Sequence, residues 1–176
     1  MEKIFNFKKI KSTSECAKEM AQNGAGEWTV VVAEEQTFGH GRKGEEWFSP
    51  LGGLYFSVIL PPSNITDLQT LTILTAFIVA KVIKENFDLE PMIKLPNDVF
   101  VNGKKICGIL TENIIIGQKI KSVIGIGLNT NTEYFSENLK NVATSLKIET
   151  IKSVDNNKIL EQIISELKNQ LKIISQ

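Results

Sequence analysis

The architecture expected of this 176-residue chain depends on residues 98–128, DVFVNGKKICGILTENIIIGQKIKSVIGIGL. Three runs rich in β-branched residues occupy this stretch, at 98–101, 105–112 and 121–128. Asn102-Gly103 separates the first two runs, and Asn-Gly is the dipeptide that two-residue hairpins prefer, because both residues tolerate positive φ. Gly117-Gln118 marks a second turn. The stretch therefore predicts three consecutive strands joined by hairpins, which makes neighbouring strands antiparallel.

Further strands and helices are predicted on both sides of this region. Three strands are expected from alternating or continuous apolar runs, at residues 4–10, 28–33 and 54–60. Three helices are expected from apolar residues at helical spacing, from Ser12 or Thr13 to about Gln22, at 68–87 and at 157–174. Strands and helices are mixed without strict alternation, so the expected class is α+β with a mixed, largely antiparallel β-sheet.

The composition fits one cytoplasmic globular domain. Hydrophobic residues make up 42% of the chain, which is enough for a sizeable core. Lysine plus arginine and aspartate plus glutamate each number 20, so the basic excess of a dedicated nucleic-acid-binding protein is missing. The N-terminus is charged early, and no apolar run reaches the roughly 18 residues that a membrane span needs. Cys16 and Cys107 have neither disulfide-framework nor metal-ligand spacing, and we expect small buried residues in a reducing compartment.

Residues 34–53 follow neither a helical nor a strand period and predict a long glycine-rich loop, which in a compact domain is usually functional or disordered. Residues 39–44, GHGRKG, have the G-x-G-x-x-G spacing of dinucleotide-binding folds. That fingerprint has to open a helix, whereas this loop continues without helical period through Pro50, so a Rossmann site is excluded. Two interpretations of the loop stay open: a phosphate site built on glycines and Arg42, or a solvated basic loop.

Five motifs along the chain resemble the characteristic segments of biotin–protein ligases. Each is weak by itself, but their common order between residues 12 and 131 is specific. The similar segments are Ser12-Thr13-Ser14 and residues 34–50, 94–98, 104–112 and 125–131. Residues 132–176 carry no such motif.

The resemblance implies the family's catalytic fold, a mixed sheet with helices packed on one face, and roles for individual residues. Those expected at biotin are Ser12, Thr13, Ser14, Gln36, Gly39, His40, Gly41, Arg42, Lys105 and Gly108. Those expected at the nucleotide are Arg42, Trp47, Asn129 and Asn131. Those expected to act in catalysis are Arg42, Lys105, Asp98 and Lys94. Asp98 would otherwise be a turn residue before the hairpin, and Lys94 a solvated residue at a strand end.

The activity that the resemblance implies is ATP-dependent biotin–protein ligation. Biotin and ATP would give biotinyl-5'-AMP, with Mg²⁺ on the phosphates, and biotin would pass to a lysine of the biotin carboxyl carrier domain of a biotin-dependent carboxylase. No protein metal site is expected, since His40 is the only histidine. A lipoate or octanoyl ligase or transferase of the same fold, and a non-catalytic biotin-binding domain, are the alternatives. Neither DNA nor a membrane is expected as a partner, and homodimerisation is left open.

The chain departs from the family pattern at four positions. His40 and Glu45 stand where arginine is usual, Leu95 where tryptophan is usual, and Ser14 where asparagine is usual. The first two changes reduce the positive charge of the loop, and Leu95 alters packing more than chemistry. Residues 1–176 are expected to form a single catalytic domain, without the N-terminal DNA-binding domain and the C-terminal β-barrel domain of some relatives.

Overall fold

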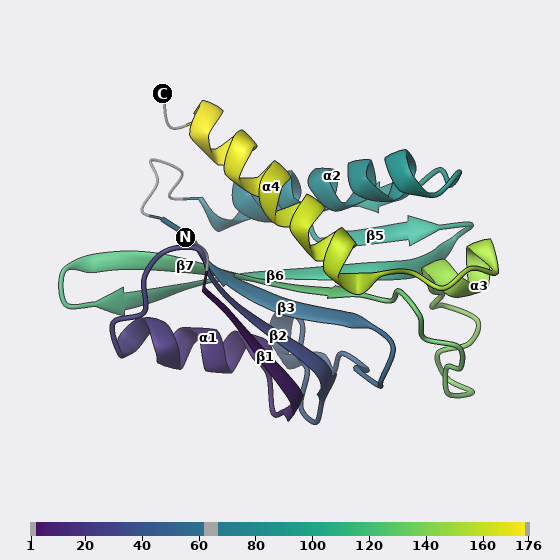
Figure 1. Ribbon diagram of the computed structural model, residues 1–176, viewed down its shortest axis with the longest axis horizontal. Coiled ribbons are helices and arrows are strands. Elements are labelled where there is room, and N and C mark those ends of the chain that lie inside the picture. The colour runs from purple at the N-terminus through teal and green to yellow at the C-terminus, as the bar shows by residue number, and fades with distance from the viewer. Residues whose placement is uncertain (1–2, 62–66, 175–176) are drawn as a thin grey trace.

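The computed structural model describes residues 3–61 and 67–174, without the side chains of Lys119 and Ile174. Within these residues, seven strands form one sheet in the order β1-β2-β3-β7-β6-β5-β4 (Figure 1). The strands are β1 (Lys3–Ile10), β2 (Thr29–Gln36), β3 (Leu54–Ile59), β4 (Met92–Lys94), β5 (Asp98–Val101), β6 (Lys104–Ile116) and β7 (Lys119–Leu128). The helices are α1 (Thr13–Gln22), α2 (Leu68–Asn86), α3 (Leu146–Thr150), α4 (Asn156–Ile174) and a short 3-10 helix, η1 (Arg42–Gly44).

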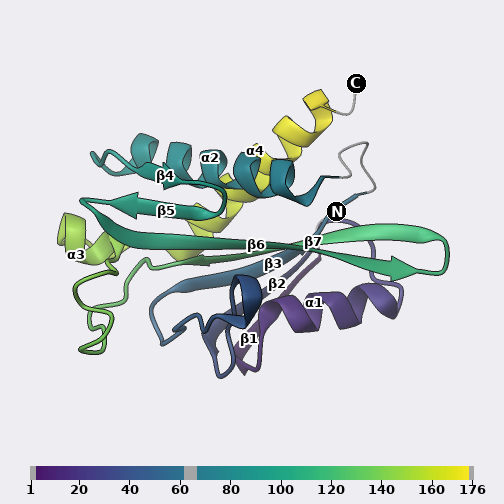
Figure 2. The same cartoon turned by 180° about the vertical axis from the view of Figure 1, so that it is seen from behind.

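Antiparallel pairing dominates the sheet. β1 pairs with β2 in parallel, and every other neighbouring pair runs antiparallel. The long β6–β7 hairpin extends beyond the rest of the sheet (Figure 2). Both expected hairpins are present, since β5 pairs with β6 and β6 pairs with β7. Their turns use positive φ, with values of 50° at Asn102, 77° at Gly103 and 60° at Gly117. The α+β class and the mixed, largely antiparallel sheet are therefore confirmed.

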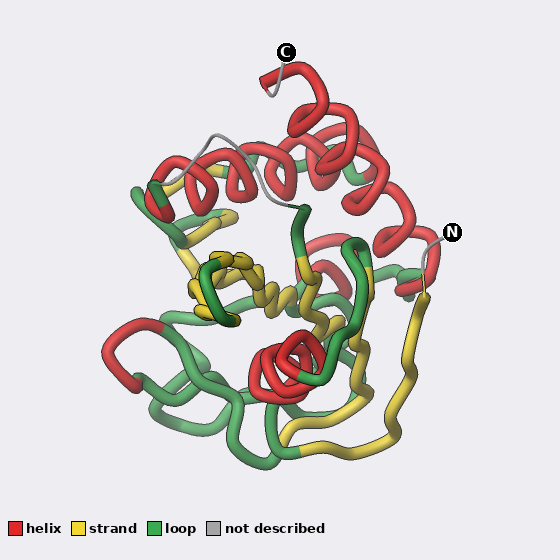
Figure 3. The backbone as a smooth tube through the Cα atoms, turned by 90° about the vertical axis from the view of Figure 1, so that its left-hand side faces the viewer, coloured by secondary structure: helices red, strands yellow, loops and turns green. Residues whose placement is uncertain are grey.

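Helices cover both faces of this sheet (Figures 1 and 3). α2 and α4 pack on one face, where their residues share a core cluster with Val30, Phe56 and Ile124. α1 packs on the other face, in a smaller cluster with Val31 and Ile59. Adjacent residues of a strand point to opposite faces, so the continuous apolar runs of β2 and β3 need a cover on each side. The expectation that the helices pack on one face is wrong, because α1 covers the face opposite to α2 and α4.

Two short elements and one strand boundary differ from the expected pattern. β4 has three residues, two of them exposed, and it forms the edge of the sheet beside β5. α3 has five residues and begins after Ser145, whose hydroxyl accepts from the N–H of Ile148 at 3.1 Å. Trp28 precedes β2 with a φ of 58° and does not belong to the strand. Elements this short bury too few side chains to generate a periodic pattern.

Only one of the two cysteines is fully buried, although both were expected to be. Cys107 is buried in the core, whereas Cys16, a residue of α1, is half-buried, and both are free thiols. Burial raises the pKa of the Cys107 thiol, so this side chain is an unreactive part of the core. None of the described helices is long and apolar enough to cross a bilayer.

Two substitutions on α4 test the layer arrangement. Ile163 is fully buried, whereas Ile173 on the same helix is 64% exposed. Ile163→Ala is expected to lower the free energy of unfolding by about 2–5 kcal/mol, because it leaves a cavity in the core. Ile173→Ala, the matched control, should change it by less than about 0.5 kcal/mol. Urea denaturation followed by circular dichroism measures both, and equal losses would contradict the assignment of the buried face.

Candidate active site

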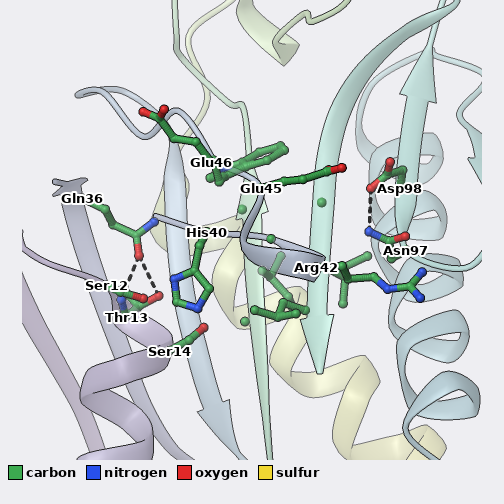
Figure 4. A pocket seen from close by; sticks show the side chains of 18 of the residues that line it. Ser12, Thr13, Ser14, Gln36, His40, Arg42, Glu45, Glu46, Asn97 and Asp98 are labelled. Carbon is green, nitrogen blue, oxygen red and sulfur yellow. Dashed lines mark hydrogen bonds between the residues drawn. The ribbon is translucent and has the colours of Figure 1, made fainter. Parts of the chain in front are cut away.

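One cavity on the α1 side of the sheet gathers most of the residues expected at the site (Figure 4). Its volume is about 280 Å³, just below the roughly 300–1,000 Å³ that is common for small-molecule sites. The lining comes from the N-terminus of α1, the end of β2, the loop before β3, and from β5, β6 and β7. The expected residues that line it are Ser12, Thr13, Ser14, Gln36, His40, Gly41, Arg42, Trp47, Asp98, Lys105 and Gly108.

Glycines on a central strand make the floor of the cavity. On the α1 face, β7 presents Val123 to the α1 core and then Gly125 and Gly127 to the cavity. A Cβ atom at Gly125 would overlap the hydroxyl of Ser14, and one at Gly127 would overlap the indole nitrogen of Trp47. Glycine in a strand is typical of such close approaches, and here side chains of the protein itself make them.

The wall beside α1 is polar and hydrogen-bonded. Ser12 caps α1, and its hydroxyl accepts from the N–H of Glu15 at 3.4 Å. Gln36 Oε1 accepts from both the N–H and the hydroxyl of Thr13, at 2.8 and 3.1 Å (Figure 4). The amide nitrogen of Gln36 donates to Ser49 Oγ at 2.9 Å. These side chains hold one another in a single orientation, so they form a preorganised polar subsite.

The other end of the cavity carries charge. Lys105 Nζ lies 2.8 Å from Asp98 Oδ1 and 5.2 Å from the centre of the Trp47 ring. Asn97 Nδ2 donates to the same carboxylate oxygen at 2.9 Å. Arg42, in η1, is exposed and also lines the cavity. Lys105 and Arg42 therefore provide cations that can meet an anionic ligand, and Asp98 provides a carboxylate beside them.

His40 lies where the cavity meets α1. Its Nε2 is 3.6 Å from Glu15 Oε1, and its Nδ1 is 3.4 Å from the carbonyl oxygen of Phe38. The hydrogen bond from Lys18 is the largest influence that lowers the pKa of Glu15, so this carboxylate is ionised near neutral pH. Glu15 therefore places a negative charge beside the imidazole of His40.

Two expected residues, Lys94 and Gly39, do not line the cavity. Lys94 is exposed on β4, with its Nζ 5.6 Å from the centre of the Phe100 ring. It belongs to the edge of the sheet. Gly39 lies behind the lining, where a Cβ atom would meet Ser49 Oγ at 2.6 Å. Gly39 therefore makes room for the polar wall instead of presenting backbone to the cavity.

The two asparagines expected at the nucleotide also lie outside the lining. Asn129 is buried, and its amide nitrogen donates to the carbonyl oxygen of Thr144 at 3.0 Å. Asn131 donates to the carbonyl oxygen of Val154 at 2.9 Å and accepts from the N–H of the same residue at 2.7 Å. Both amides tie the chain after β7 to backbone that follows it, a role that the motif alone does not distinguish from ligand binding.

Ser49 and Ser57 are the side chains that sequence reasoning overlooked. Ser57 is fully buried on β3, and its hydroxyl donates to Thr13 Oγ1 at 2.9 Å. Ser49 is also buried, and it connects Gln36 to the carbonyl oxygen of Trp47. A serine inside the apolar run LYFSVIL was the available signal, because a buried hydroxyl needs a hydrogen-bond partner.

Gly127→Ala tests the floor of the cavity. The added methyl group would overlap Trp47 Nε1, so we expect the indole to move, its emission to shift to longer wavelength, and stability to fall by about 1–3 kcal/mol. Fluorescence in a Trp28→Phe background isolates the signal, since the chain has two tryptophans. Gly26→Ala is the matched control, because a Cβ atom there meets nothing within 4 Å. An unchanged spectrum for Gly127→Ala would show that the floor is wrongly assigned.

Comparison with known proteins places the chain among ligases. Residues 6–129 match the model of the biotin/lipoate A/B protein ligase family. The chain is 39% identical over 160 residues to the bifunctional ligase/repressor BirA of Bacillus subtilis and 30% identical over 151 residues to that of Escherichia coli. The alignments cover 88% and 84% of this chain and 49% and 47% of those proteins, so the chain spans about half of their length.

Solved structures share the fold over almost the whole chain. The biotin protein ligase from Aquifex aeolicus in complex with biotin and ATP has a TM-score of 0.89 and 31% identity to this chain. The match covers 99% of this chain and 72% of that one. Together with the family model and the ordered motifs around the cavity, this likeness shows that the chain belongs to the biotin/lipoate A/B protein ligase family.

Proposed function

We propose that the chain acts as an ATP-dependent biotin–protein ligase. It would form biotinyl-5'-AMP from biotin and ATP and pass the biotin to one lysine of the biotin carboxyl carrier domain of a biotin-dependent carboxylase. The observation that carries the proposal is the meeting, in one cavity, of the hydrogen-bonded wall at Thr13 and Gln36 with the cations Arg42 and Lys105. The biotin protein ligases among the structural relatives support the same substrates.

The first step has to bring two anions together. A carboxylate oxygen of biotin attacks the α-phosphorus of ATP, a P–O bond forms, and the bond to pyrophosphate breaks. Repulsion between two unit charges at 4 Å is about 1 kcal/mol in water and several times larger in a drier site. Arg42 and Lys105 are placed to offset that repulsion. The indole of Trp47, packed beside Lys105, would border the nucleotide and exclude water.

The second step needs a neutral amine on the carrier. A free lysine has a pKa of about 10.4, so less than roughly one in a thousand is neutral at pH 7. The amine attacks the carbonyl carbon of the adenylate, AMP leaves, and the amine gives up a proton. Asp98 is our candidate acceptor, because its carboxylate lies 2.8 Å from Lys105 at the cavity wall. We assign no step to Lys94, Asn129 or Asn131.

Mg²⁺ would accompany ATP. Among the residues that the structure describes, no three histidine, cysteine, aspartate or glutamate side chains are grouped to hold a metal ion. Phosphate oxygens would therefore be its main ligands, and its charge would add to that of Arg42 and Lys105. We place the reaction in the cytoplasm, where ATP is available and where thiols such as Cys107 stay reduced.

Two alternatives would use the same cavity. A lipoate or octanoyl ligase or transferase lies within the range of the family, and a biotin-binding domain without transfer activity needs only the polar wall. The oriented groups of Thr13 and Gln36 favour a ligand with a polar ring over one with an alkyl chain. The cations Arg42 and Lys105 favour a site that handles phosphate over one that only binds.

Mass spectrometry after incubation with substrates tests the proposal. Biotin plus ATP should give a tightly held biotinyl-adenylate, and a biotin carboxyl carrier domain added next should gain biotin on one lysine. Lipoate plus ATP, the matched control, should give no adenylate. A lipoyl-adenylate without biotinyl-adenylate would favour the first alternative, and bound biotin without adenylate would favour the second.

Lys105→Ala tests the role of this cation. We expect single-turnover adenylate formation to slow by roughly 10²–10³-fold, because the two anions then meet with less neutralising charge. Stability should change by less than about 1 kcal/mol, since the Lys105–Asp98 pair is partly exposed. Lys104→Ala is the matched control, because Lys104 donates to the carbonyl oxygen of Lys140 and lies outside the lining. Equal rates for both variants would remove Lys105 from the mechanism.

The loop at residues 39–46 should become more ordered when the adenylate forms. It contains a residue with positive φ, Lys43 at 57°, and a single isolated bridge between His40 and Glu46. Ordering costs about 1–2 kcal/mol per residue in backbone entropy, so ligand contacts have to offset it. Hydrogen exchange across the loop should slow with a non-hydrolysable adenylate analogue, with β3 as the internal control. Arg42→Gly should still bind the ring of biotin, whose partners lie elsewhere, but should release the adenylate to solvent. Equal exchange in both states would contradict a closing loop.

A further inference from the structure

A chain of hydrogen bonds runs behind the polar wall of the cavity. Ser14 Oγ lies 3.1 Å from Ser57 Oγ, and the hydroxyl of Ser57 donates to Thr13 Oγ1 at 2.9 Å. The hydroxyl of Thr13 donates to Gln36 Oε1 at 3.1 Å. Ser14 and Thr13 line the cavity, whereas Ser57 is fully buried and does not. A ligand can therefore meet Ser14 and Thr13, but it cannot meet the residue that joins them.

The hydrogen bonds of Ser49 and Gln36, at the far end of this series, decide which atom donates in each of the others. A carbonyl oxygen only accepts, so Ser49 donates its single hydrogen to Trp47 O at 3.0 Å and has to accept from Gln36 Nε2. A backbone N–H only donates, so the N–H of Thr13 requires Gln36 to present its Oε1. Both neighbours thus orient the Gln36 amide in the same way.

The donor in the hydrogen bond between Ser57 and Ser14 follows from these assignments. The hydroxyl of Thr13 has given its hydrogen to Gln36, so it accepts from Ser57. Ser57 has then used its only hydrogen, so the hydrogen between Ser14 and Ser57 comes from Ser14. Ser14 therefore turns its hydrogen inward and presents only lone pairs to the cavity.

We propose that Ser57 is a positioning residue that sets substrate specificity. It holds Ser14 as a hydrogen-bond acceptor and so selects a ligand that brings an N–H to this wall, as the cyclic urea of biotin does. Gly125, paired with Ser57 across β3 and β7, leaves the space that the Ser14 hydroxyl fills, so the acceptor is held in place from both sides. The identity of the ring rests on the biotin ligase function proposed above.

The test compares biotin with its two cyclic carbamate analogues, each with one ring N–H replaced by oxygen. An oxygen that faces Ser14 sets acceptor against acceptor, so the wild-type chain should bind one analogue at least about thirtyfold more weakly than biotin. Ser57→Ala frees the Ser14 hydroxyl to turn and donate to that oxygen. The ratio of the two dissociation constants, measured by titration calorimetry, should then fall at least about tenfold.

Matched variants separate positioning from general damage. Thr75→Val is the control, because Thr75 carries another fully buried hydroxyl, which donates to the carbonyl oxygen of Leu71 within α2. It should leave the ratio unchanged. Ser57→Thr keeps the hydroxyl and should retain the wild-type ratio. A Ser57→Ala variant that loses affinity for both ligands alike would show a merely structural role and overturn the proposal.

A second variant keeps the proposal testable if Ser57→Ala folds poorly. Ser14→Ala removes the acceptor itself and should abolish the discrimination, and adding Ser57→Ala should change the ratio no further. Wild-type discrimination that survives Ser14→Ala would overturn the proposal. Tight biotin binding with no preference over either carbamate would reject the role of Ser57 alone, whereas no biotin binding by the wild-type chain would reject the proposed function with it.

Discussion

At Gly125 and Gly127, strand β7 presents no side chain to the α1 face of the sheet, and the arrangement of the cavity depends on those two missing Cβ atoms. Ser14 and Trp47 occupy the places that such atoms would take. These two side chains come from separate segments, the start of α1 and the loop before β3, and they reach the floor only where the strand is bare. Glycine weakens a strand by roughly 0.5–1 kcal/mol relative to alanine, and antiparallel pairing with β3 and β6 offsets this loss.

The opposite face of β7 supplies the rigidity that the floor needs. Ile124, Ile126 and Leu128 alternate with the glycines and belong to the core beneath α2 and α4. One strand is therefore core on one face and cavity floor on the other. Close packing keeps this strand in place, and with it the floor of the cavity.

Turn residues and apolar spacing predicted the helices and strands. Which residues face the cavity, and which hold the backbone behind it, depends on contacts between residues far apart in the sequence. The Asn102-Gly103 turn and the apolar spacing of residues 157–174 each lie within one element, so the hairpin and the last helix were predicted correctly. Motif order found many cavity residues but could not distinguish those that face the cavity from those that brace the backbone. Asn131 stands in a motif and bonds to the backbone of another segment, while Ser57 stands in none and orients the wall. A hydrogen-bond partner is a property of the fold and cannot be read from spacing.

Two side chains at the cavity, Lys105 and His40, already lie beside carboxylates of the protein. Lys105 pairs with Asp98 at 2.8 Å, and His40 lies 3.6 Å from Glu15, which Lys18 helps to keep ionised. The formal net charge of zero therefore includes an ion pair at the site, between Lys105 and Asp98. A phosphate that binds Lys105 has to compete with Asp98, and the carboxylate that loses this partner is left beside the reacting atoms. When the nucleotide takes Lys105 as its partner, Asp98 would thus be freed to accept a proton from the amine. This order favours adenylate formation before transfer in the proposed reaction.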